Sequence, residues 1–185
     1  AAGVFSFEEG LKIVKKRAEL MSQAEGGGMA AVLGMESAAI EATLKEKGRD
    51  AIDIANYNSN VQTVVSGPLA DIEKAIEDLQ DAGAKRVVQL RVSGAFHSSL
   101  VEDARSGMDA FLSEVVIREP RAIFVSNVAG GALRDPEEIR KNLVAQVTSP
   151  VRWVDDVRAL ARRSASLFLE VGPGNVLRGL LRKIE

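Results

Sequence analysis

The chain has 185 residues, of which 46% are hydrophobic and 27% charged, enough to bury a core without disulfide or metal support. It has no cysteine and one histidine, which excludes cysteine nucleophiles, thiolate metal sites and histidine-rich metal clusters. A net charge of −2 and few aromatic residues give no signature of nucleic-acid binding. No apolar stretch is long enough to span a bilayer and no signal peptide opens the chain, so we expect a cytoplasmic protein.

The first predicted element is a helix over residues 6–22. Its expected buried stripe consists of Leu11, Val14, Ala18 and Met21. Arg17 borders this stripe, whereas Lys12 and Lys16 point away from it. A guanidinium at the edge of a buried face suits bidentate binding of a carboxylate, but it also suits a long side chain that merely covers apolar surface. The local sequence leaves both interpretations open.

Residues 27–93 alternate strand and helix signals at short intervals. The expected elements are a strand at 29–34, a helix between 37 and 48, strands at 52–55 and 61–65, a helix around 72–79 and a strand at 87–92. The segment 58–60 is a good turn, so the two middle strands should form a hairpin. The order β-α-β-β-α-β is the ferredoxin-like pattern.

Residues 94–185 give a different pattern. The expected elements are a helix at 98–116, a short strand at 123–125, helices starting at Asp135-Pro136 and Ser149-Pro150, a strand at 167–171 and a final helix. Gly172-Pro173-Gly174 lacks the pattern of a phosphate-binding loop and is interpreted as a tight turn between that strand and helix. Strand, glycine turn and helix favour a parallel α/β layer, but two strands are too few, so part of this layer should lie outside the sequence.

His97 is the first candidate for chemistry, because it follows a predicted strand and precedes a predicted helix. Imidazole suits general base catalysis near neutral pH, although a helix-capping or surface histidine would fit the same place. The neighbouring Ser98 and Ser99 are poorly placed to act as its nucleophile, and the elbow motif Gly-x-Ser-x-Gly does not occur.

Three amide side chains, Asn56, Asn58 and Gln62, cluster around the predicted hairpin. Neutral amides can position a substrate carbonyl, but such residues more often serve only the turn itself.

Five motifs occur in an order that covers essentially the whole chain. They are Arg17-Ala18-Glu19-Leu20-Met21, Asn56-Tyr57-Asn58 with Gln62, Gly94-Ala95-Phe96-His97-Ser98, Gln146 with Ser149-Pro150-Val151-Arg152-Trp153, and Glu170-Val171-Gly172-Pro173-Gly174-Asn175-Val176-Leu177. Together they resemble the malonyl-CoA:acyl-carrier-protein transacylases. The resemblance implies an α/β-hydrolase-like domain with an inserted ferredoxin-like subdomain.

The resemblance also implies ping-pong transfer of malonyl from coenzyme A to acyl carrier protein through an acyl-serine, in fatty acid biosynthesis, without a metal or redox cofactor. His97 matches the histidine that activates the serine, and Gln146 the residue whose backbone carbonyl orients it. Arg17 matches the arginine that pairs with the malonyl carboxylate. Asn58 matches an amide lining the acyl site, and Phe96 a bulky ring that leaves little room for a methyl branch.

One departure from the family pattern is that the serine elbow and the glutamine of the oxyanion hole have no counterpart here. We therefore expect the chain to be the C-terminal portion of a transacylase, which would be a monomer when complete. Residues 1–26 and 94–185 should form the partial α/β-hydrolase-like domain, and residues 27–93 the ferredoxin-like subdomain.

Two other functions stay open at this point. The chain could belong to the acyltransferase domain of a polyketide synthase. Alternatively, it could be a non-catalytic module that binds an acidic carrier protein through Lys85, Arg86, Arg91 and Arg178, although such charges also occur on any solvated face.

Overall fold

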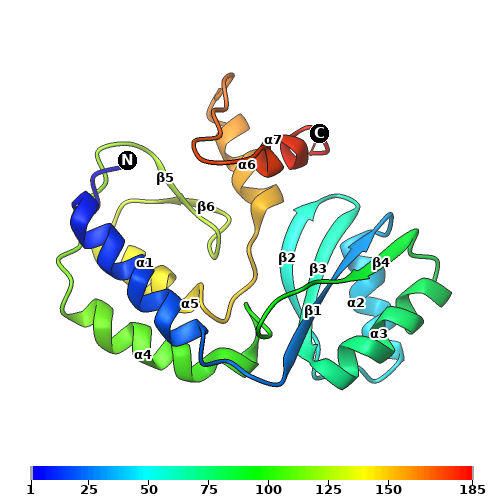
Figure 1. Cartoon of the computed structure of the whole chain (residues 1–185). Coiled ribbons are helices and arrows are strands. Elements are labelled where there is room, and N and C mark those ends of the chain that lie inside the picture. Colours follow the sequence, from blue (N-terminus) through cyan, green and yellow to red (C-terminus); the bar gives the residue numbers. More distant parts are fainter. Residues whose placement is uncertain (1, 185) are drawn as a thin grey trace.

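A computed structural model describes residues 2–184 and shows two groups of elements side by side (Figure 1). The first group comprises β1 (Gly27–Leu33), α2 (Ser37–Glu46), β2 (Asp53–Ser59), β3 (Gln62–Pro68), α3 (Leu69–Asp81) and β4 (Arg86–Gln89). The second comprises α1 (Phe7–Met21), a 3-10 turn (Ser99–Val101), α4 (Glu102–Ser113), β5 (Phe124–Ser126), β6 (Gly131–Leu133), α5 (Pro136–Ala145), α6 (Trp153–Ala161) and α7 (Val176–Leu181).

The first group is a four-stranded antiparallel sheet in the order β2-β3-β1-β4, with α2 and α3 packed on one face. This topology confirms the predicted ferredoxin-like order. Apolar residues alternate along the strands, so Val32 and Val65 pack against the helices while Met29 and Val64 face the opposite way. Phe96 packs against that second face, so the sheet supports the segment that carries His97.

Two predicted strand ends differ from the structure. The hairpin turn was expected at residues 58–60, but β2 continues to Ser59, which pairs with Gln62, and the turn lies at Asn60 and Val61. Irregular pairing along β2 lets the strand run on past the turn-forming amides. At the other edge, β4 ends at Gln89 instead of Val92, because the Val92 N–H bonds back to the Leu90 carbonyl at 3.1 Å and turns the chain.

The helices of the second group begin close to their expected positions, but α1 buries only Met21 of its expected stripe, and Ala18 is exposed. Its capping box is complete, with the Glu9 N–H donating to Ser6 Oγ and the Ser6 N–H to Glu9 Oε2. Ile13 and Met21 are buried against the cluster that α4 and α5 share. Leu11 and Val14, predicted as buried, are 55% and 65% exposed. They lie along the side of the helix turned away from this cluster.

The helix predicted at 98–116 is shorter than expected: a 3-10 turn precedes α4, and Leu100 is half exposed. The Asp135-Pro136 start is as expected, since the Asp135 carboxylate accepts from the N–H groups of Glu137 and Glu138. The helix expected from Ser149-Pro150 begins later, at Trp153.

The strand predicted at 167–171 is not formed within residues 2–184. Leu167, Leu169 and Val171 are 75%, 78% and 94% exposed, and this orange segment of Figure 1 loops away from the rest. A strand needs a hydrogen-bonded neighbour, and none of the described residues supplies one. Both sheets within residues 2–184 are antiparallel, so the α/β layer, which the sequence predicts to be only partial, contributes no parallel sheet within these residues.

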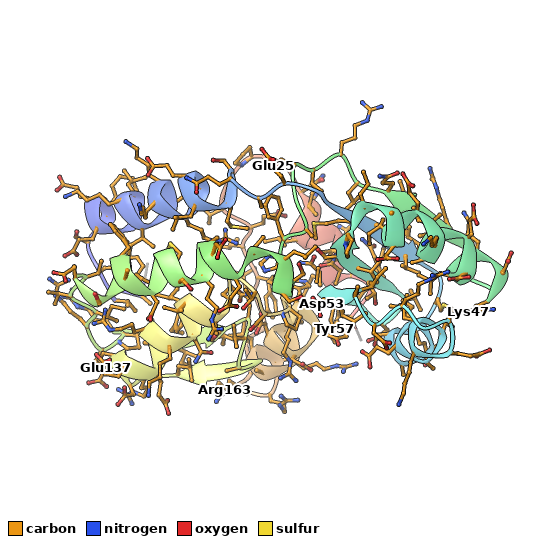
Figure 2. The ribbon with its side chains drawn as sticks, turned by 90° about the horizontal axis from the view of Figure 1, so that it is seen from below. Glu25, Lys47, Asp53, Tyr57, Glu137 and Arg163 are labelled. Carbon is orange, nitrogen blue, oxygen red and sulfur yellow. The ribbon has the colours of Figure 1, made fainter. Side chains whose placement is uncertain are left out.

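Contacts near Asp53 and Tyr57, both labelled in Figure 2, help to join the groups at their junction. Val151, ahead of α6, pairs with the edge strand β2: its N–H donates to the Ala55 carbonyl at 2.8 Å, and its carbonyl accepts from the Tyr57 N–H at 2.9 Å. Ser99 binds the Asp53 carboxylate through its N–H at 3.0 Å and its hydroxyl at 3.2 Å. The site described below lies at this junction.

The mixed α/β class with a ferredoxin-like subdomain is therefore confirmed, whereas the expected division at residues 26/27 and 93/94 stays a prediction. Among residues 2–184, no helix is both long and apolar enough to cross a membrane.

Gly27 offers a test of the junction, because a Cβ placed there would lie 2.5 Å from both the Cβ and the backbone nitrogen of Ala95. We expect Gly27→Ala to lower the free energy of unfolding by about 1–3 kcal/mol, since the backbone before His97 would have to move. Urea denaturation measures the change. Gly179→Ala, in open space on α7, is the matched control and should stabilise by about 0.5–1 kcal/mol. Equal effects of the two substitutions would contradict the close contact.

Candidate active site

His97 lies in the short connection between β4 and the 3-10 turn, with a backbone φ of 58°. A positive φ is rare outside glycine and is held only by surrounding contacts. Ser98 supplies such contacts: its hydroxyl donates to the Ala95 carbonyl at 2.7 Å and accepts from the Leu100 N–H at 3.3 Å. The Ser98 hydroxyl is thus used in capping, and His97 is fixed on a rigid turn.

The imidazole of His97 is oriented by the carbonyl of Gln146, just beyond the end of α5. Nδ1 of His97 lies 2.9 Å from this oxygen. Because a carbonyl only accepts, the pairing places the proton on Nδ1 and leaves the lone pair on Nε2. The side-chain amide of Gln146 donates to the Ser149 carbonyl at 3.1 Å and holds its own backbone in place.

Burial lowers the pKa of His97 from its ordinary value of 6.5, and the Arg17 cation lowers it further. The carbonyls of Gln146 and Ser149 act in the opposite direction but do not offset the burial. The imidazole is therefore neutral at physiological pH, which is the form that can accept a proton.

Arg17 and His97 line the same two concavities, one of about 710 Å³ and one of about 510 Å³. Arg17 is half-buried on α1, and burial lowers the pKa of its guanidinium. Among residues 2–184, no carboxylate or carbonyl forms an ion pair or hydrogen bond with it by the usual distance criteria. A cation in this position is available to an anionic ligand.

The other predicted site residues divide between the two concavities and the rest of the surface. Phe96 lines the smaller concavity with Met29 and Asn56. Asn58 lines neither, because it lies at an irregularity in the pairing of β2, two residues beyond Asn56. The sequence placed both amides in one cluster, but only the pairing of the strand shows which of them faces the cavity.

Asn127 was missed by the sequence analysis. It follows β5 and lines the larger concavity together with His97 and Gln146. Its Nδ2 donates to Oδ2 of Asp156 at 2.5 Å, and Asp156 is only 4% exposed. Burial, with some repulsion from Asp155, raises the pKa of Asp156 to about 6. An isolated polar residue in a turn gives no signal in the sequence that would have pointed to this contact.

The larger concavity is bordered by an apolar face of α1, formed by Phe7, Leu11 and Val14. Phe7 is 81% exposed. A base and a cation thus lie beside open apolar surface, an arrangement that would become secluded from water if that surface were covered.

The described residues contain no ready nucleophile for His97 to activate. Ser98 is engaged in capping, and Ser99 binds Asp53. No group of three histidine, aspartate or glutamate side chains within residues 2–184 could hold a metal ion. What these residues supply is a neutral base, a cation and amide groups.

The four basic residues considered for carrier binding do not share one edge of the sheet. Lys85 and Arg86 lie at the start of β4, and Arg91 shortly beyond its end, at one edge of the sheet. Arg178 is on α7, which packs near β2 at the opposite edge. Binding of a carrier protein by these residues stays a prediction.

The fold agrees with comparisons to known proteins. Residues 1–183 match the family described as the acyl transferase domain, and the chain belongs to this family of acyltransferases. Among curated relatives, the polyketide biosynthesis protein ThaF of Burkholderia thailandensis is 46% identical over 184 residues, which are 100% of this chain and 16% of ThaF. A malonyl CoA-acyl carrier protein transacylase of Staphylococcus aureus is 40% identical over 190 residues, covering 100% of this chain and 62% of the relative.

Solved structures give the same result. An acyl-carrier-protein S-malonyltransferase of Burkholderia pseudomallei superposes with a TM-score of 0.95 at 37% identity, over 100% of this chain and 61% of that one. A malonyl-transacylase in complex with a type II polyketide synthase acyl carrier protein superposes with a TM-score of 0.93 at 33% identity, over 99% of this chain and 60% of that one. These matches confirm the resemblance seen in the motifs, and the chain spans less than two thirds of each of these relatives.

The only histidine of the chain makes the electrostatics of the site directly measurable. We expect its imidazole C–H signal in NMR spectra to titrate below 6.5, and Arg17→Gln to raise that midpoint, because a nearby cation disfavours the imidazolium. Lys12→Gln removes an exposed charge from the same helix and should leave the midpoint unchanged. A midpoint that is insensitive to Arg17, or that moves equally in both variants, would show that the two groups do not share a cavity.

Proposed function

We propose that this chain carries the general base and the carboxylate-binding residue of an enzyme that transfers malonyl from coenzyme A to acyl carrier protein. The observation that carries the proposal is the Nδ1–carbonyl hydrogen bond between His97 and Gln146, with Arg17 lining the same concavities. The names of the transacylase relatives support the choice of substrate class.

In the proposed reaction, Nε2 of His97 takes the proton of a serine hydroxyl as its oxygen attacks the thioester carbonyl of malonyl-CoA. The C–S bond then breaks, and the imidazolium returns the proton to the departing coenzyme A thiolate. The second half repeats these steps in reverse, with the pantetheine thiol of the carrier protein attacking the acyl-serine. The Gln146 carbonyl stabilises the transient imidazolium in the place where other triads use a carboxylate.

The serine is not among the candidates in the 185 residues, since Gly-x-Ser-x-Gly does not occur in them. We propose that it comes from the part of the fold that the longer relatives have in addition. The apolar face of α1 beside Arg17 and His97 is where that part would pack, which would bring the hydroxyl to Nε2.

Arg17 gives the proposed enzyme its selectivity for malonyl over uncharged acyl groups. Its guanidinium has no acidic partner among residues 2–184, so the malonyl carboxylate can occupy its donors in a bidentate pair. Phe96 would limit room for a branch beside the acyl carbon, and Asn58 stays a predicted site residue without an observed contact to the cavity.

Arg17→Lys tests the proposed selectivity in the intact enzyme. Because lysine keeps the charge but loses the planar fork, we expect kcat/KM for malonyl-CoA to fall about 10- to 100-fold, with little change for acetyl-CoA. His97→Ala is the control for the chemistry and should lower transfer of both acyl groups by at least about 100-fold. Equal losses for malonyl and acetyl in Arg17→Lys would refute the carboxylate contact.

Two pathways remain for the proposed activity. Fatty acid biosynthesis is the pathway that the resemblance of the motifs implies, whereas the higher identity to the polyketide biosynthesis protein ThaF favours a second candidate, malonyl loading in polyketide biosynthesis. In the first case, we expect the intact enzyme to malonylate a fatty-acid-type carrier protein with a higher kcat/KM than a polyketide-type carrier. Mass spectrometry of the two carriers measures this ratio, and a reversed preference would support the second candidate.

A further inference from the structure

Asn127 is held on a turn that is fixed from several sides. Ser126 Oγ donates to Asn142 Oδ1 on α5 at 2.8 Å, and the Ser126 carbonyl accepts from the Gly130 N–H at 2.8 Å. The backbone carbonyl of Asn127 accepts from the Arg152 N–H at 3.1 Å. The turn is therefore bonded to α5 on one side and to the start of α6 on the other, and it places Asn127 in the wall of the larger concavity.

The side chain of Asn127 is bonded to a carboxyl group that is otherwise poorly satisfied. Asp156 is 4% exposed, its Oδ2 accepts the 2.5 Å bond from Asn127, and its Oδ1 has no partner within residues 2–184. Arg152, the nearby cation, pairs with Asp155 instead, at 2.8 and 2.7 Å. A buried carboxylate with one donor is costly, so stability does not explain why Asp156 is buried here.

The chemistry of the pair fixes which way the amide faces. An ionised carboxylate only accepts hydrogen bonds, so the nitrogen of Asn127 must face Asp156. The amide oxygen then has no partner among the described residues and is the group left for the concavity.

We propose that Asp156 is a positioning residue that fixes the Asn127 amide oxygen as a hydrogen-bond acceptor for an amide N–H of the pantetheine arm of the acyl thioester. The inference rests on the proposed function, which supplies the thioester. The malonyl group has no N–H, whereas the pantetheine arm carries two amides, so the arm is the part of the substrate that this acceptor fits.

Ionisation of Asp156 controls the proposed orientation. Burial and Asp155 raise the pKa of Asp156 to about 6, and Arg152 opposes this shift. Below that pH the protonated carboxyl can donate to the Asn127 oxygen, and the amide can rotate to present its nitrogen to the concavity. Acceptance of a pantetheine N–H should therefore weaken as the pH falls through about 6.

The first experiment needs no catalysis. Side-chain amide NMR signals of Asn127 in this chain are followed from pH 4.5 to 8 (chosen to bracket the titration by at least about one unit on each side). We expect a titration with a midpoint of about 6 that is lost in Asp156→Asn. Asp155→Asn is the matched control, because it removes a half-exposed neighbouring carboxylate and should keep the titration while lowering its midpoint. An Asn127 signal that does not titrate, or that still titrates in Asp156→Asn, would overturn the proposed pair.

The second experiment measures the intact enzyme. We expect Asp156→Leu to raise KM for malonyl-CoA about tenfold at pH 7.5 with kcat changed less than about twofold, the size of one hydrogen bond. Asp156→Asn keeps an oxygen that can accept from Asn127 and should recover most of the loss. In the unsubstituted enzyme, KM should rise below pH 6, where a change in His97 would instead appear in kcat.

These outcomes separate the inference from the proposed function. If the unsubstituted enzyme does not transfer malonyl while the Asn127 signal titrates as expected, the proposed function is refuted. The Asp156–Asn127 pair is then confirmed, but its proposed role toward the pantetheine arm is refuted. A normal KM in folded Asp156→Leu, or equal losses of kcat, KM and melting temperature in Asp156→Leu and Asp156→Asn, would refute the positioning role.

Discussion

The hydrogen bond from Nδ1 of His97 to the Gln146 carbonyl connects the two groups of elements and sets the chemistry between them. His97 follows the ferredoxin-like sheet, and Gln146 ends a helix of the other group, so the bond forms only when the two groups are packed together. It also selects the tautomer with a free Nε2, because the carbonyl cannot donate. The pairing of Val151 with β2 and the contact of Gly27 with Ala95 hold the same junction.

Charge burial distinguishes this junction from the rest of the molecule. Most ion pairs of the described residues lie on exposed surfaces, such as Lys15 with Glu19 and Arg134 with Glu119, where they contribute little. Arg17, His97 and Asp156 instead have pKa values displaced mainly by burial. The charges of Arg17 and of ionised Asp156 are therefore held at a cost in free energy, whereas burial favours the neutral form of His97, and such displaced pKa values are common at ligand-binding sites.

The local patterns of the sequence predicted the fold well where each element carries its own signal. The ferredoxin-like order, the Asp135-Pro136 start and the helix at 6–22 depend on neighbouring residues and were found. The strand predicted at 167–171 is not formed, because a strand depends on a partner strand that no pattern in those residues specifies. The predicted burial of Leu11 and Val14 on α1 was wrong for a related reason. Both side chains are apolar, but the described residues offer them nothing to pack against.

The site residues were likewise predicted where a local motif marks them and missed where only distant contacts bring them together. His97, Gln146, Arg17 and Phe96 were singled out by a resemblance of motifs, whereas spacing alone left the roles of His97 and Arg17 open. Asn127 and Asp156 are 29 residues apart and are joined only by the packing of α6 on the ribbon of β5 and β6, which no periodicity reveals.

The open apolar face of α1 bears on the strength of these electrostatic effects. Arg17 and His97 line concavities that are open to water in the described residues, so solvent screens the pair. Covering Phe7, Leu11 and Val14 would remove that water, strengthen the attraction between Arg17 and a bound carboxylate, and lower the pKa of an unliganded His97 further. A bound carboxylate would then oppose the effect of the Arg17 cation and raise the proton affinity of the imidazole. The base would thus become stronger when an anionic substrate is in place, which couples substrate charge to proton transfer through the contacts of one half-buried arginine.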